Sequence, residues 1–369
     1  MRKLDGKKIV LALTGSIACV ECVKLARALI RHGAEVISIM SKEACRILNP
    51  LAMEFATGKK VITELKGEHV CNYDLLLIAP CTANTISKIA LGIADNVVTT
   101  FALTAKKILI APAMHLSIYE NKFIKENLKK CMEKGIEIVK PKIEENKAKI
   151  ADIEEIVEKT IRILREDKKI KNKKILIIGG ATFEAIDDVR GITNLSSGKM
   201  AICLAKEAYE RGMDVELWMN KIPIKLQEIK YKEFMNINDL IDLINNCKEF
   251  YDIVINCGAL SDFIVEKRKG KIESKKEIEI KLYPAPRINP LLRKLGKIVI
   301  GFKLEKNEEN IVEKSLKKLE EDKLDYVIGN TIESIGKDDA KIWIIGKEGL
   351  IKKIKEKKEE IAREIINLI

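Results

Sequence analysis

The sequence predicts an α/β protein with two Rossmann-like, three-layer domains whose sheets are largely parallel. Short apolar segments alternate along the chain with longer amphipathic segments, which is typical of right-handed βαβ units. The alternation starts twice in nearly the same way, at residues 7–15 and again at 173–180. Both segments are apolar runs that end in glycine, as expected for a buried parallel strand that leads into an anion-binding turn. The length of 369 residues also fits two domains.

The remaining strands follow from the same alternation. In the first half, strands are expected at 35–40, 75–79 and 107–110. In the second half, they are expected at 215–219, 252–257, 297–302, 326–329 and 342–345.

A run of charged residues at 165–174 separates the two halves and follows an amphipathic helix predicted at 153–164. Because the run has almost nothing to bury, we interpret it as a linker with the domain boundary near residue 170. The predicted domains are residues 1–170 and 171–369. The C-terminal stretch 352–369 is predicted to be a charged amphipathic helix that packs on the second sheet.

The composition narrows the class of protein. No apolar run reaches the roughly 18 residues needed to cross a membrane, and no signal peptide is evident, so a cytoplasmic protein is expected. The nine cysteines are scattered singly, which favours reduced thiols over a disulfide scaffold. The net charge of +12 suits either nucleic acid or phosphorylated small molecules. Because aromatic residues make up only 5% of the chain, no nucleic-acid partner is expected.

In the first half, polar loops follow three of the predicted strands. The run G-S-I-A at residues 15–18 opens a helix, where backbone N–H groups and the positive helix end favour an anion. The run P-C-T-A-N at 80–84 opens another helix, and P-A-M-H at 112–115 follows the third strand. An open α/β sheet binds its ligand at such carboxyl ends of strands. Since the sequence lacks G-x-G-x-x-G, a dinucleotide is not favoured.

The first helix also carries Cys19 and Cys22 in C-x-x-C spacing. A thiolate would be stabilised near a helix start. Without a second pair or a nearby histidine, however, zinc is not expected. The two thiols are therefore expected in the core.

Together the three loops resemble those of the homo-oligomeric flavin-containing cysteine decarboxylases, over about the first 165 residues. That family has a G-S-I-A loop, an A-P-x-[ST]-A-N-T loop that holds FMN, and a P-x-M-N-x-x-M-[WY] motif. The resemblance implies a catalytic base at His69 and substrate contacts from Met114 and His115. In the implied chemistry, the flavin oxidises a cysteine thiol to a thioaldehyde, CO₂ is lost, and the reduced flavin returns its hydride. FMN binding is implied for Gly15, Ser16, Ile17, Ser41, Thr82 and Asn84.

Two departures from the family pattern concern the decarboxylation step. His115 stands where the family has the Asn that grips the substrate carboxylate, and an imidazole can donate the same hydrogen bond. The loop that carries a reductive Cys in bacterial members corresponds to residues 143–150, which contain none. Lys147 or Lys149 of this loop can clamp a phosphorylated substrate, and Cys131 is assigned no role. An alternative therefore stays open, in which the first domain binds flavin but does not decarboxylate.

In the second half, the run S-S-G-K at residues 196–199 stands immediately before a predicted helix. Hydroxyls, N–H groups and a lysine at a helix start form an anion cradle, although the Walker A pattern is not met. With residues 179–194, this run resembles the G-G-T-x-E-P-I-D-x-V-R-x-I-[ST]-N-x-S-S-G-x-M signature of phosphopantothenate–cysteine ligases. Ala185 stands in place of the Pro. The resemblance extends over the rest of the chain.

This second resemblance implies roles for the matching residues. Asn194 would bind the acyl-cytidylate intermediate, Lys271 would act on the phosphates as a catalytic residue, and Asp262 would lie at the nucleotide and at Mg²⁺. Arg287 replaces the Asp of the family's N-P-D-I motif, and Lys323 is displaced by one from the second of two nucleotide-binding lysines. Phosphopantothenate binding is implied for Asn194, Ser196, Ser197, Gly198 and Lys199. Nucleotide binding is implied for Ala259, Asp262, Lys271, Pro286, Arg287, Ile288, Asn289, Phe302, Lys318 and Lys323.

The chemistry implied for the second half is carboxylate activation. The carboxylate of 4′-phosphopantothenate attacks the nucleotide α-phosphate, pyrophosphate leaves, and the amine of L-cysteine attacks the acyl-nucleotide. A lysine and Mg²⁺ suit the charge that builds on the phosphate oxygens. Bacterial relatives imply CTP as the cosubstrate and eukaryotic relatives imply ATP, and CTP is the preferred interpretation.

The two halves thus imply consecutive steps of coenzyme A biosynthesis. Ligation makes 4′-phosphopantothenoylcysteine, and decarboxylation yields 4′-phosphopantetheine. By resemblance, the expected protein is a bifunctional homo-oligomer with trimeric flavin domains and dimeric ligase domains. Its expected partners are 4′-phosphopantothenate, L-cysteine and CTP, without nucleic acid or a membrane. A decarboxylase of peptide C-terminal cysteines would explain only half of the chain.

Overall fold

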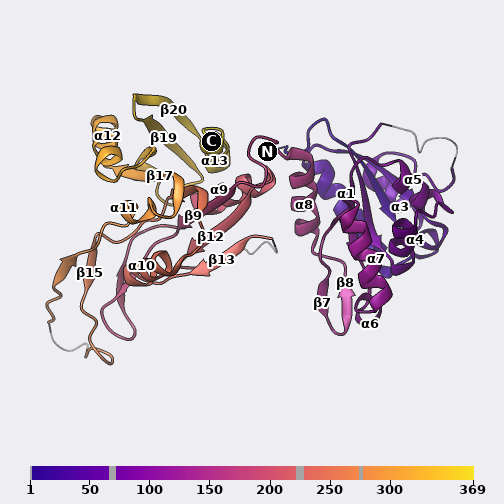
Figure 1. The fold of residues 1–369 in the computed structure, drawn as a ribbon, viewed down its shortest axis with the longest axis horizontal. Helices are drawn as coiled ribbons and strands as arrows, with labels where there is room; N and C mark the ends of the chain where they lie inside the picture. The colour runs from indigo at the N-terminus through magenta and orange to yellow at the C-terminus, as the bar shows by residue number, and fades with distance from the viewer. Residues whose placement is uncertain (1, 66–71, 222–227, 274–276) are drawn as a thin grey trace. The chain divides into compact units, whose positions relative to one another are not determined.

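The computed structural model describes residues 2–65, 72–221, 228–273 and 277–369. The chain divides into two compact units, the first ending at Glu166 and the second beginning at Asp167 (Figure 1). Each unit contains an open sheet covered by helices.

The sheet of the first unit has five strands in the order β2-β1-β3-β4-β6, and every neighbouring pair is parallel. Both β3 and β4 are buried at every position, because helices cover both faces of the sheet. The strands are β1 (Lys8–Leu13), β2 (Glu35–Met40), β3 (Leu75–Cys81), β4 (Ile108–Pro112) and β6 (Glu137–Ile138).

Alternate residues of β1 face two different helix layers, as the two-residue period of a strand requires. Ile9 and Leu11 belong to the layer formed by α1 (Cys22–Arg31), α3 (Pro50–Thr57) and α8 (Ile153–Arg165). Val10 and Ala12 belong to the layer formed by α4 (Ala83–Leu91), α5 (Val97–Thr104) and α7 (Lys122–Glu133). The smaller elements are η1 (Ile17–Glu21), α2 (Lys42–Ile47), α6 (Leu116–Tyr119), β5 (Met114–His115), β7 (Lys142–Glu144) and β8 (Lys147–Lys149).

The second unit is built on an eight-stranded sheet in the order β13-β12-β9-β14-β17-β18-β19-β20. Pairing is parallel from β13 to β18 and antiparallel from β18 to β20. The strands are β9 (Lys174–Gly179), β12 (Asp214–Met219), β13 (Lys230–Glu233), β14 (Tyr251–Asn256), β17 (Gly296–Glu305), β18 (Tyr326–Thr331), β19 (Asp339–Gly346) and β20 (Gly349–Lys357).

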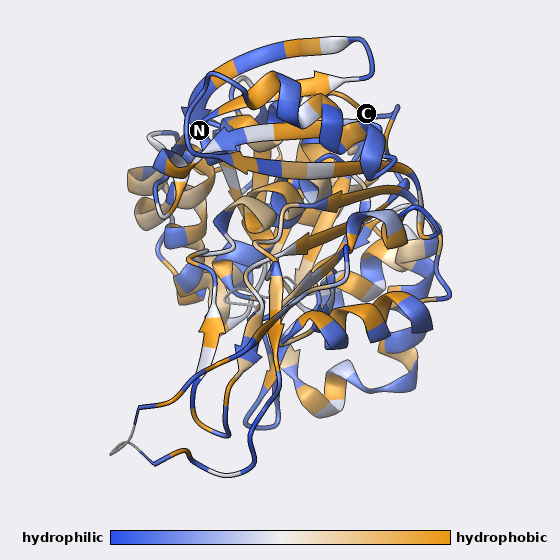
Figure 2. Cartoon of the chain, turned by 90° about the vertical axis from the view of Figure 1, so that its left-hand side faces the viewer, coloured by the Kyte–Doolittle hydropathy of each residue, from blue (hydrophilic) through white to orange (hydrophobic). Residues whose placement is uncertain are grey.

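Two helix layers again enclose this sheet. One face packs on α9 (Lys199–Glu210) and α13 (Lys358–Ile366), and the other packs on α10 (Ile237–Asn246), α11 (Asn289–Leu292) and α12 (Ile311–Glu321). Figure 2 shows strands largely in orange under helices striped orange and blue, the pattern of a buried sheet under amphipathic helices. The remaining elements are the ribbons β10 (Phe183–Ala185) with β11 (Gly191–Thr193) and β15 (Phe263–Val265) with β16 (Leu282–Pro284), and the short helix η3 (Ile332–Ser334).

The predicted α/β class and largely parallel sheets are confirmed, and every predicted strand is present. The prediction for the C-terminal stretch is wrong in part, because residues up to Lys357 form the edge strand β20 and only α13 is helical. Charged side chains protect an exposed sheet edge just as they cover a helix, so the charge pattern did not separate the two. The charged run between the halves also contributes Ile170, 2% exposed, to the core of the second unit. None of the described helices is long and apolar enough to cross a membrane.

Candidate functional site

In the first unit, strand β1 lies at the point where the strand order changes direction, with β2 on one side and β3 on the other. Open α/β sheets bind ligands outside the carboxyl ends of the strands at such a point. The loops after β1, β2 and β3 all lead into helices here. Ser16, Ser41 and Thr82 cap these helices, each accepting a hydrogen bond from a backbone N–H of the first turn.

Thr14 joins the loops that follow β1 and β3. Its buried hydroxyl donates a hydrogen bond to the carbonyl oxygen of Pro80 at 2.8 Å and accepts one from the N–H of Thr82 at 3.0 Å. No pattern in the sequence indicated Thr14, although it directly precedes the G-S-I-A run. Its hydroxyl holds two of the predicted flavin-binding loops side by side.

These loops fit a flavin mononucleotide. Backbone N–H groups and hydroxyls at three helix starts suit its phosphate, and Ile17, 75% exposed, offers an apolar surface beside them. Gly15 allows the close approach of two loops, because a Cβ there would lie 2.5 Å from the Cβ of Glu43. Thr82 is partly buried and Asn84 is exposed at the start of α4.

Met114 and His115 form the short strand β5, which pairs antiparallel with β8, opposite Ala148 and Lys147. His115 caps α6 because its Nδ1 accepts a hydrogen bond from the N–H of Ser117 at 3.4 Å. A neutral ring that accepts at Nδ1 carries its proton on Nε2, where it can donate to a ligand. The imidazole therefore takes the capping role that Asn commonly fills.

The stretch that lacks the family cysteine forms the hairpin β7–β8. Glu145 and Asn146, with φ of 50° and 58°, make its turn. Lys149 forms ion pairs with Glu144 at 3.3 Å and with Glu145 at 3.0 Å. The hairpin lies beside β5 and thus beside the predicted substrate residues. The predicted base, His69, lies outside the described residues.

Cys19 and Cys22 are buried in the core, as predicted. The Cys19 thiol donates to the carbonyl oxygen of Thr14 at 3.1 Å, and the Cys22 thiol donates to that of Ala79 at 3.0 Å. Burial raises the pKa of both thiols, which keeps them protonated. Within the described ranges, no cluster of three or more metal-ligating side chains is present.

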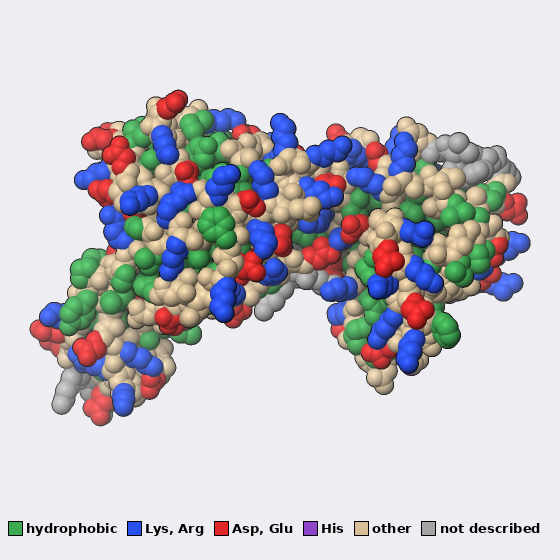
Figure 3. Space-filling view, in the orientation of Figure 1, with side chains coloured by type: hydrophobic (Ala, Val, Ile, Leu, Met, Phe, Trp, Pro, Cys, Tyr) green, Lys and Arg blue, Asp and Glu red, His purple; other side chains and the backbone are tan. Residues whose placement is uncertain are grey.

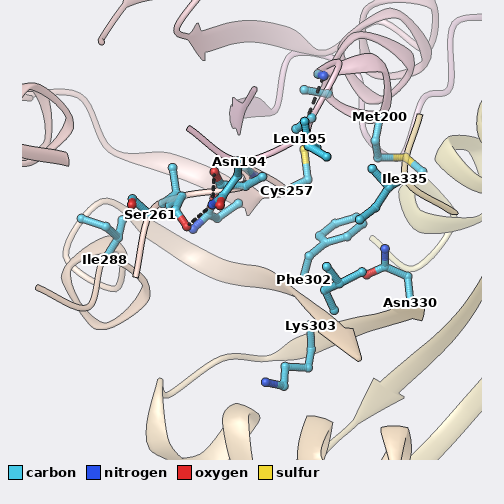
Figure 4. Close-up of a pocket in the computed structure, with 18 of the residues that line it drawn as sticks. Asn194, Leu195, Met200, Cys257, Ser261, Ile288, Phe302, Lys303, Asn330 and Ile335 are labelled. Carbon is cyan, nitrogen blue, oxygen red and sulfur yellow. Dashed lines mark hydrogen bonds between the residues drawn. The ribbon is translucent and has the colours of Figure 1, made fainter. Parts of the chain in front are cut away.

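In the second unit, a pocket of about 660 Å³ opens at the carboxyl ends of β14, β17 and β18 (Figure 4). This volume is in the range of ordinary small-molecule sites. It brings together most of the residues that the ligase resemblance implied, but Lys271 and Lys323 do not line it. The implied residues in its wall are Asn194, Ser196, Ser197, Gly198, Lys199, Ala259, Asp262, Pro286, Arg287, Ile288, Asn289, Phe302 and Lys318.

Asn194 ties two walls of this pocket together. Its Nδ2 donates hydrogen bonds to the carbonyl oxygens of Ala259 at 3.1 Å and Leu260 at 3.0 Å, the contacts dashed in Figure 4. Gly198, at the start of α9, has a φ of 68°, which favours glycine. The S-S-G-K run is thus held as a tight helix start at the pocket rim.

One wall of the pocket is apolar. Figure 4 shows the ring of Phe302 beside Ile335 and Met200, with Asn330 nearby. Lys358, the first residue of α13, also lines the pocket; it is 8% exposed and its Nζ donates to the carbonyl oxygen of Ser334 at 3.3 Å. Burial, aided by the charge of Lys199, lowers the pKa of Lys358. No pattern in the sequence indicated Lys358, because it is one of many lysines near the C-terminus.

Lys271 belongs to a loop that is clasped by the I-D-D-V-R part of the ligase signature. The Asp187 carboxylate accepts a hydrogen bond from the N–H of Ile272 at 3.0 Å, and Arg190 donates to the carbonyl oxygen of Ile272 at 2.5 Å. Burial acts to raise the pKa of Asp187, but its hydrogen bonds from backbone N–H groups and Arg190 outweigh burial and hold the pKa well below the usual range. The backbone beside Lys271 is therefore tied to the turn at Asp187–Arg190, and Lys271 itself does not line the pocket.

The fold and these sites define a class of protein: a flavodoxin-like flavin-binding unit followed by a second α/β unit with a ligand pocket. A family model described as "Flavoprotein" matches residues 1–165. A second, described as "DNA/pantothenate metabolism flavoprotein C-terminal domain", matches residues 170–369.

Relatives and a solved structure are similar to this chain. A "Coenzyme A biosynthesis bifunctional protein CoaBC" of Thermococcus kodakarensis is 42% identical, covering 99% of this chain and 95% of the relative. One of the same description from Methanocaldococcus jannaschii is 39% identical, covering 99% and 94%. A DNA/pantothenate metabolism flavoprotein structure from Streptococcus pneumoniae is 26% identical, covers 53% of this chain and 97% of its own, and has a TM-score of 0.48. The chain belongs to the CoaBC family of bifunctional proteins.

Proposed function

We propose that the chain carries out two consecutive steps of coenzyme A biosynthesis. The second unit ligates L-cysteine to 4′-phosphopantothenate, and the first unit decarboxylates the resulting 4′-phosphopantothenoylcysteine to 4′-phosphopantetheine. The observation that carries the proposal is the pocket of the second unit, which gathers residues from five separate segments that the ligase pattern places in one site. The curated relatives, whose names state coenzyme A biosynthesis, support it.

In the ligase reaction, the rim of the pocket supplies donors to a phosphorylated substrate. Ser196, Ser197 and the helix start at Gly198 would bind the phosphate of 4′-phosphopantothenate. Asn194 would contact the acyl-nucleotide intermediate, and Phe302 would pack on the base. Lys271 would neutralise charge as it builds on the α-phosphate, which requires its loop to reach the bound nucleotide.

CTP is the proposed cosubstrate, together with Mg²⁺. The exposed pocket carboxylate of Asp262 suits Mg²⁺, because this ion usually binds one or two carboxylates and completes its shell with water and substrate phosphates. Mg²⁺ bound there would supply charge for the departing pyrophosphate. CTP is preferred to ATP on the resemblance alone, so both nucleotides belong in the test.

In the first unit, FMN would be held by Gly15, Ser16, Ile17, Ser41, Thr82 and Asn84, and it would supply the redox chemistry for decarboxylation. His115 would donate from Nε2 to the substrate carboxylate, with Met114 packed beside the substrate. His69 would act as the base. The hairpin β7–β8, which carries Lys147, would cover the bound substrate.

A second candidate function keeps the ligase and removes the decarboxylase. It is favoured by His115 in place of Asn and by a hairpin without cysteine. In that case the first unit would bind FMN as a structural group and release no CO₂.

The proposed biological setting is a cytoplasmic homo-oligomer with small-molecule partners and no nucleic acid or membrane. On the face drawn in Figure 3, Lys and Arg side chains are interspersed with Asp and Glu, and they form no continuous basic surface. A surface with both signs of charge offers the phosphates of a nucleic acid no continuous row of cations.

A coupled assay tests the proposal. The purified chain is supplied with 4′-phosphopantothenate, L-cysteine, Mg²⁺ and either CTP or ATP, and products are followed by mass spectrometry alongside the visible spectrum of the protein. A yellow protein that forms 4′-phosphopantetheine supports both activities, and the faster nucleotide is the cosubstrate. Accumulation of 4′-phosphopantothenoylcysteine supports the ligase-only alternative, and no ligation product overturns the ligase assignment.

A further inference from the structure

A buried carboxylate in the pocket, Asp322, has no part in the chemistry above. It follows α12 and is 1% exposed. A guanidinium nitrogen of Arg287 lies 2.5 Å from its Oδ1, and Lys318 Nζ lies 2.9 Å from its Oδ2. Two cations from different elements therefore share one carboxylate at the pocket wall.

The buried Oδ1 of Asp322 is compensated by the charge of Arg287. No other donor in the described part of the chain makes a hydrogen bond to this atom. A buried carboxylate oxygen needs a partner. The positions of the Asp322 carboxylate and the Arg287 guanidinium are therefore tied to each other.

Asp322 is also linked to the floor of the pocket. Asn289 Nδ2 donates to Asp322 Oδ2 at 2.9 Å, and Asn256 Nδ2 donates to Asn289 Oδ1 at 2.7 Å. Asn256 Oδ1 in turn accepts from the N–H of Gly258 at 3.1 Å. The network runs from the two cations to the loop that carries the predicted metal ligand, Asp262.

The charges leave a positive wall at this end of the pocket. Glu321 also contacts Arg287 at 3.1 Å, but its side chain is 43% exposed and does not line the pocket, so solvent screens this pair. Asp322 is the buried carboxylate that both cations contact, while the side chains of Arg287 and Lys318 are 55% and 24% exposed. A guanidinium has five N–H donors in a planar fork that suits phosphate oxygens.

We infer that Asp322 is a positioning residue that holds Arg287 and Lys318 as paired donors to the phosphates of the nucleotide cosubstrate. The inference rests on the proposed ligase function and deepens it. It also accounts for two departures from the ligase pattern. Arg287 replaces an Asp, and Lys323 is displaced so that Asp322 lines the pocket instead. The two altered positions form one ion pair with each other. Its cation, Arg287, lies in the loop before α11, and its carboxylate, Asp322, follows α12.

Steady-state ligation and calorimetric titration with CTP test this role, with ATP in parallel. Asp322→Asn in the full chain keeps the shape of the side chain and removes its charge. It should raise both the KM and the Kd for the nucleotide about tenfold or more, because the buried partner then no longer holds the two cations by its charge. The kcat and the KM for L-cysteine should change by less than about threefold.

Three further variants separate positioning from stability. Asp325→Asn breaks a comparable ion pair with Arg293, 2.6 Å long and outside the pocket, and Glu321→Gln removes the exposed partner of Arg287. Neither should raise the KM for the nucleotide more than about twofold. The exchange Arg287→Asp with Asp322→Lys should recover the nucleotide affinity to within about threefold, and it carries the test if Asp322→Asn does not fold.

Several results would overturn the inference. These are an unchanged KM for the nucleotide in Asp322→Asn, an equal rise in the KM for L-cysteine, or a folded exchange variant that recovers no affinity. A wild-type chain that binds CTP but forms no ligation product would instead overturn the proposed function, and the calorimetric comparison would still decide the role of Asp322.

Discussion

The two units prepare their sites with different kinds of bond. In the first unit, loops at the strand ends are joined by neutral hydrogen bonds, with Thr14 between two of them and hydroxyl caps on the helices. In the second unit, the corresponding work is done by carboxylates, Asp187 at one loop and Asp322 at another, each holding an arginine. Neutral bonds between adjacent strand ends make a rigid cradle, which suits a resident cofactor. Charged side chains attract one another over longer distances, so they can hold together loops that are far apart in the sequence.

The largest effect is expected from Lys271, whose loop is bonded to Asp187 and Arg190. Its replacement tests whether this loop of the second unit takes part in catalysis. Lys271→Gln should lower the kcat of ligation about 100- to 1000-fold, because it removes a charge that stabilises the developing oxyanion. Decarboxylation of supplied 4′-phosphopantothenoylcysteine should be unchanged. Lys269→Gln, two residues earlier in the same loop, is the matched control, and an equal loss in both variants would count against a specific role for Lys271.

A second prediction concerns the neutral bridge in the first unit. Thr14→Val keeps the shape of the side chain but removes both hydrogen bonds, so the affinity for FMN should fall about tenfold and the free energy of unfolding by about 1–3 kcal/mol. Flavin fluorescence titration and thermal unfolding measure the two quantities. Thr57→Val, which removes a hydroxyl bonded to Met53 and to the backbone of Lys59 at the end of α3, is the control and should leave FMN affinity unchanged.

A third prediction separates the two candidate functions of the first unit at His115. If the imidazole caps α6 and donates from Nε2, His115→Asn should keep decarboxylation within about threefold, since Asn supplies both an acceptor and a donor. His115→Ala should lower the rate about tenfold and destabilise the helix start by about 1 kcal/mol. CO₂ release from 4′-phosphopantothenoylcysteine is the measurement. Equal rates in the wild type and both variants would show that His115 has no role in decarboxylation.

The smallest expected effect is on stability at low pH. The pKa of Asp187 in the folded unit lies well below its usual value of 3.8, so the charged carboxylate stabilises the fold above that pH. This contribution should be lost as the pH falls toward the folded-state pKa. The difference in free energy of unfolding between the wild type and Asp187→Asn should therefore be constant near neutral pH and shrink below about pH 4. If the difference in free energy of unfolding grew on acidification, the charged Asp187 carboxylate would not stabilise the fold through its hydrogen bonds to Arg190 and to the Lys271 loop.

How far the sequence could predict the molecule depended on the range of the interactions. The central strands were predictable because a buried parallel strand is an uninterrupted apolar run, as in Leu75–Cys81. The edge strand β20 was not, because Lys352 and its charged neighbours are exposed there as they would be on a helix. In the sites, recognisable motifs indicated Asn194 and Thr82. They did not indicate Thr14, Lys358 or Asp322, whose importance comes from partners distant in sequence.

By itself, the sequence determined the α/β class, the two-part organisation and the motifs that mark each site, because these follow from local periodicity and short-range loop chemistry. Tertiary structure alone decided that Arg287 and Lys318 share the buried carboxylate of Asp322, and that Asp187 holds the backbone of the Lys271 loop. Such pairings depend on burial and on distances across the fold, which no local pattern of residues contains.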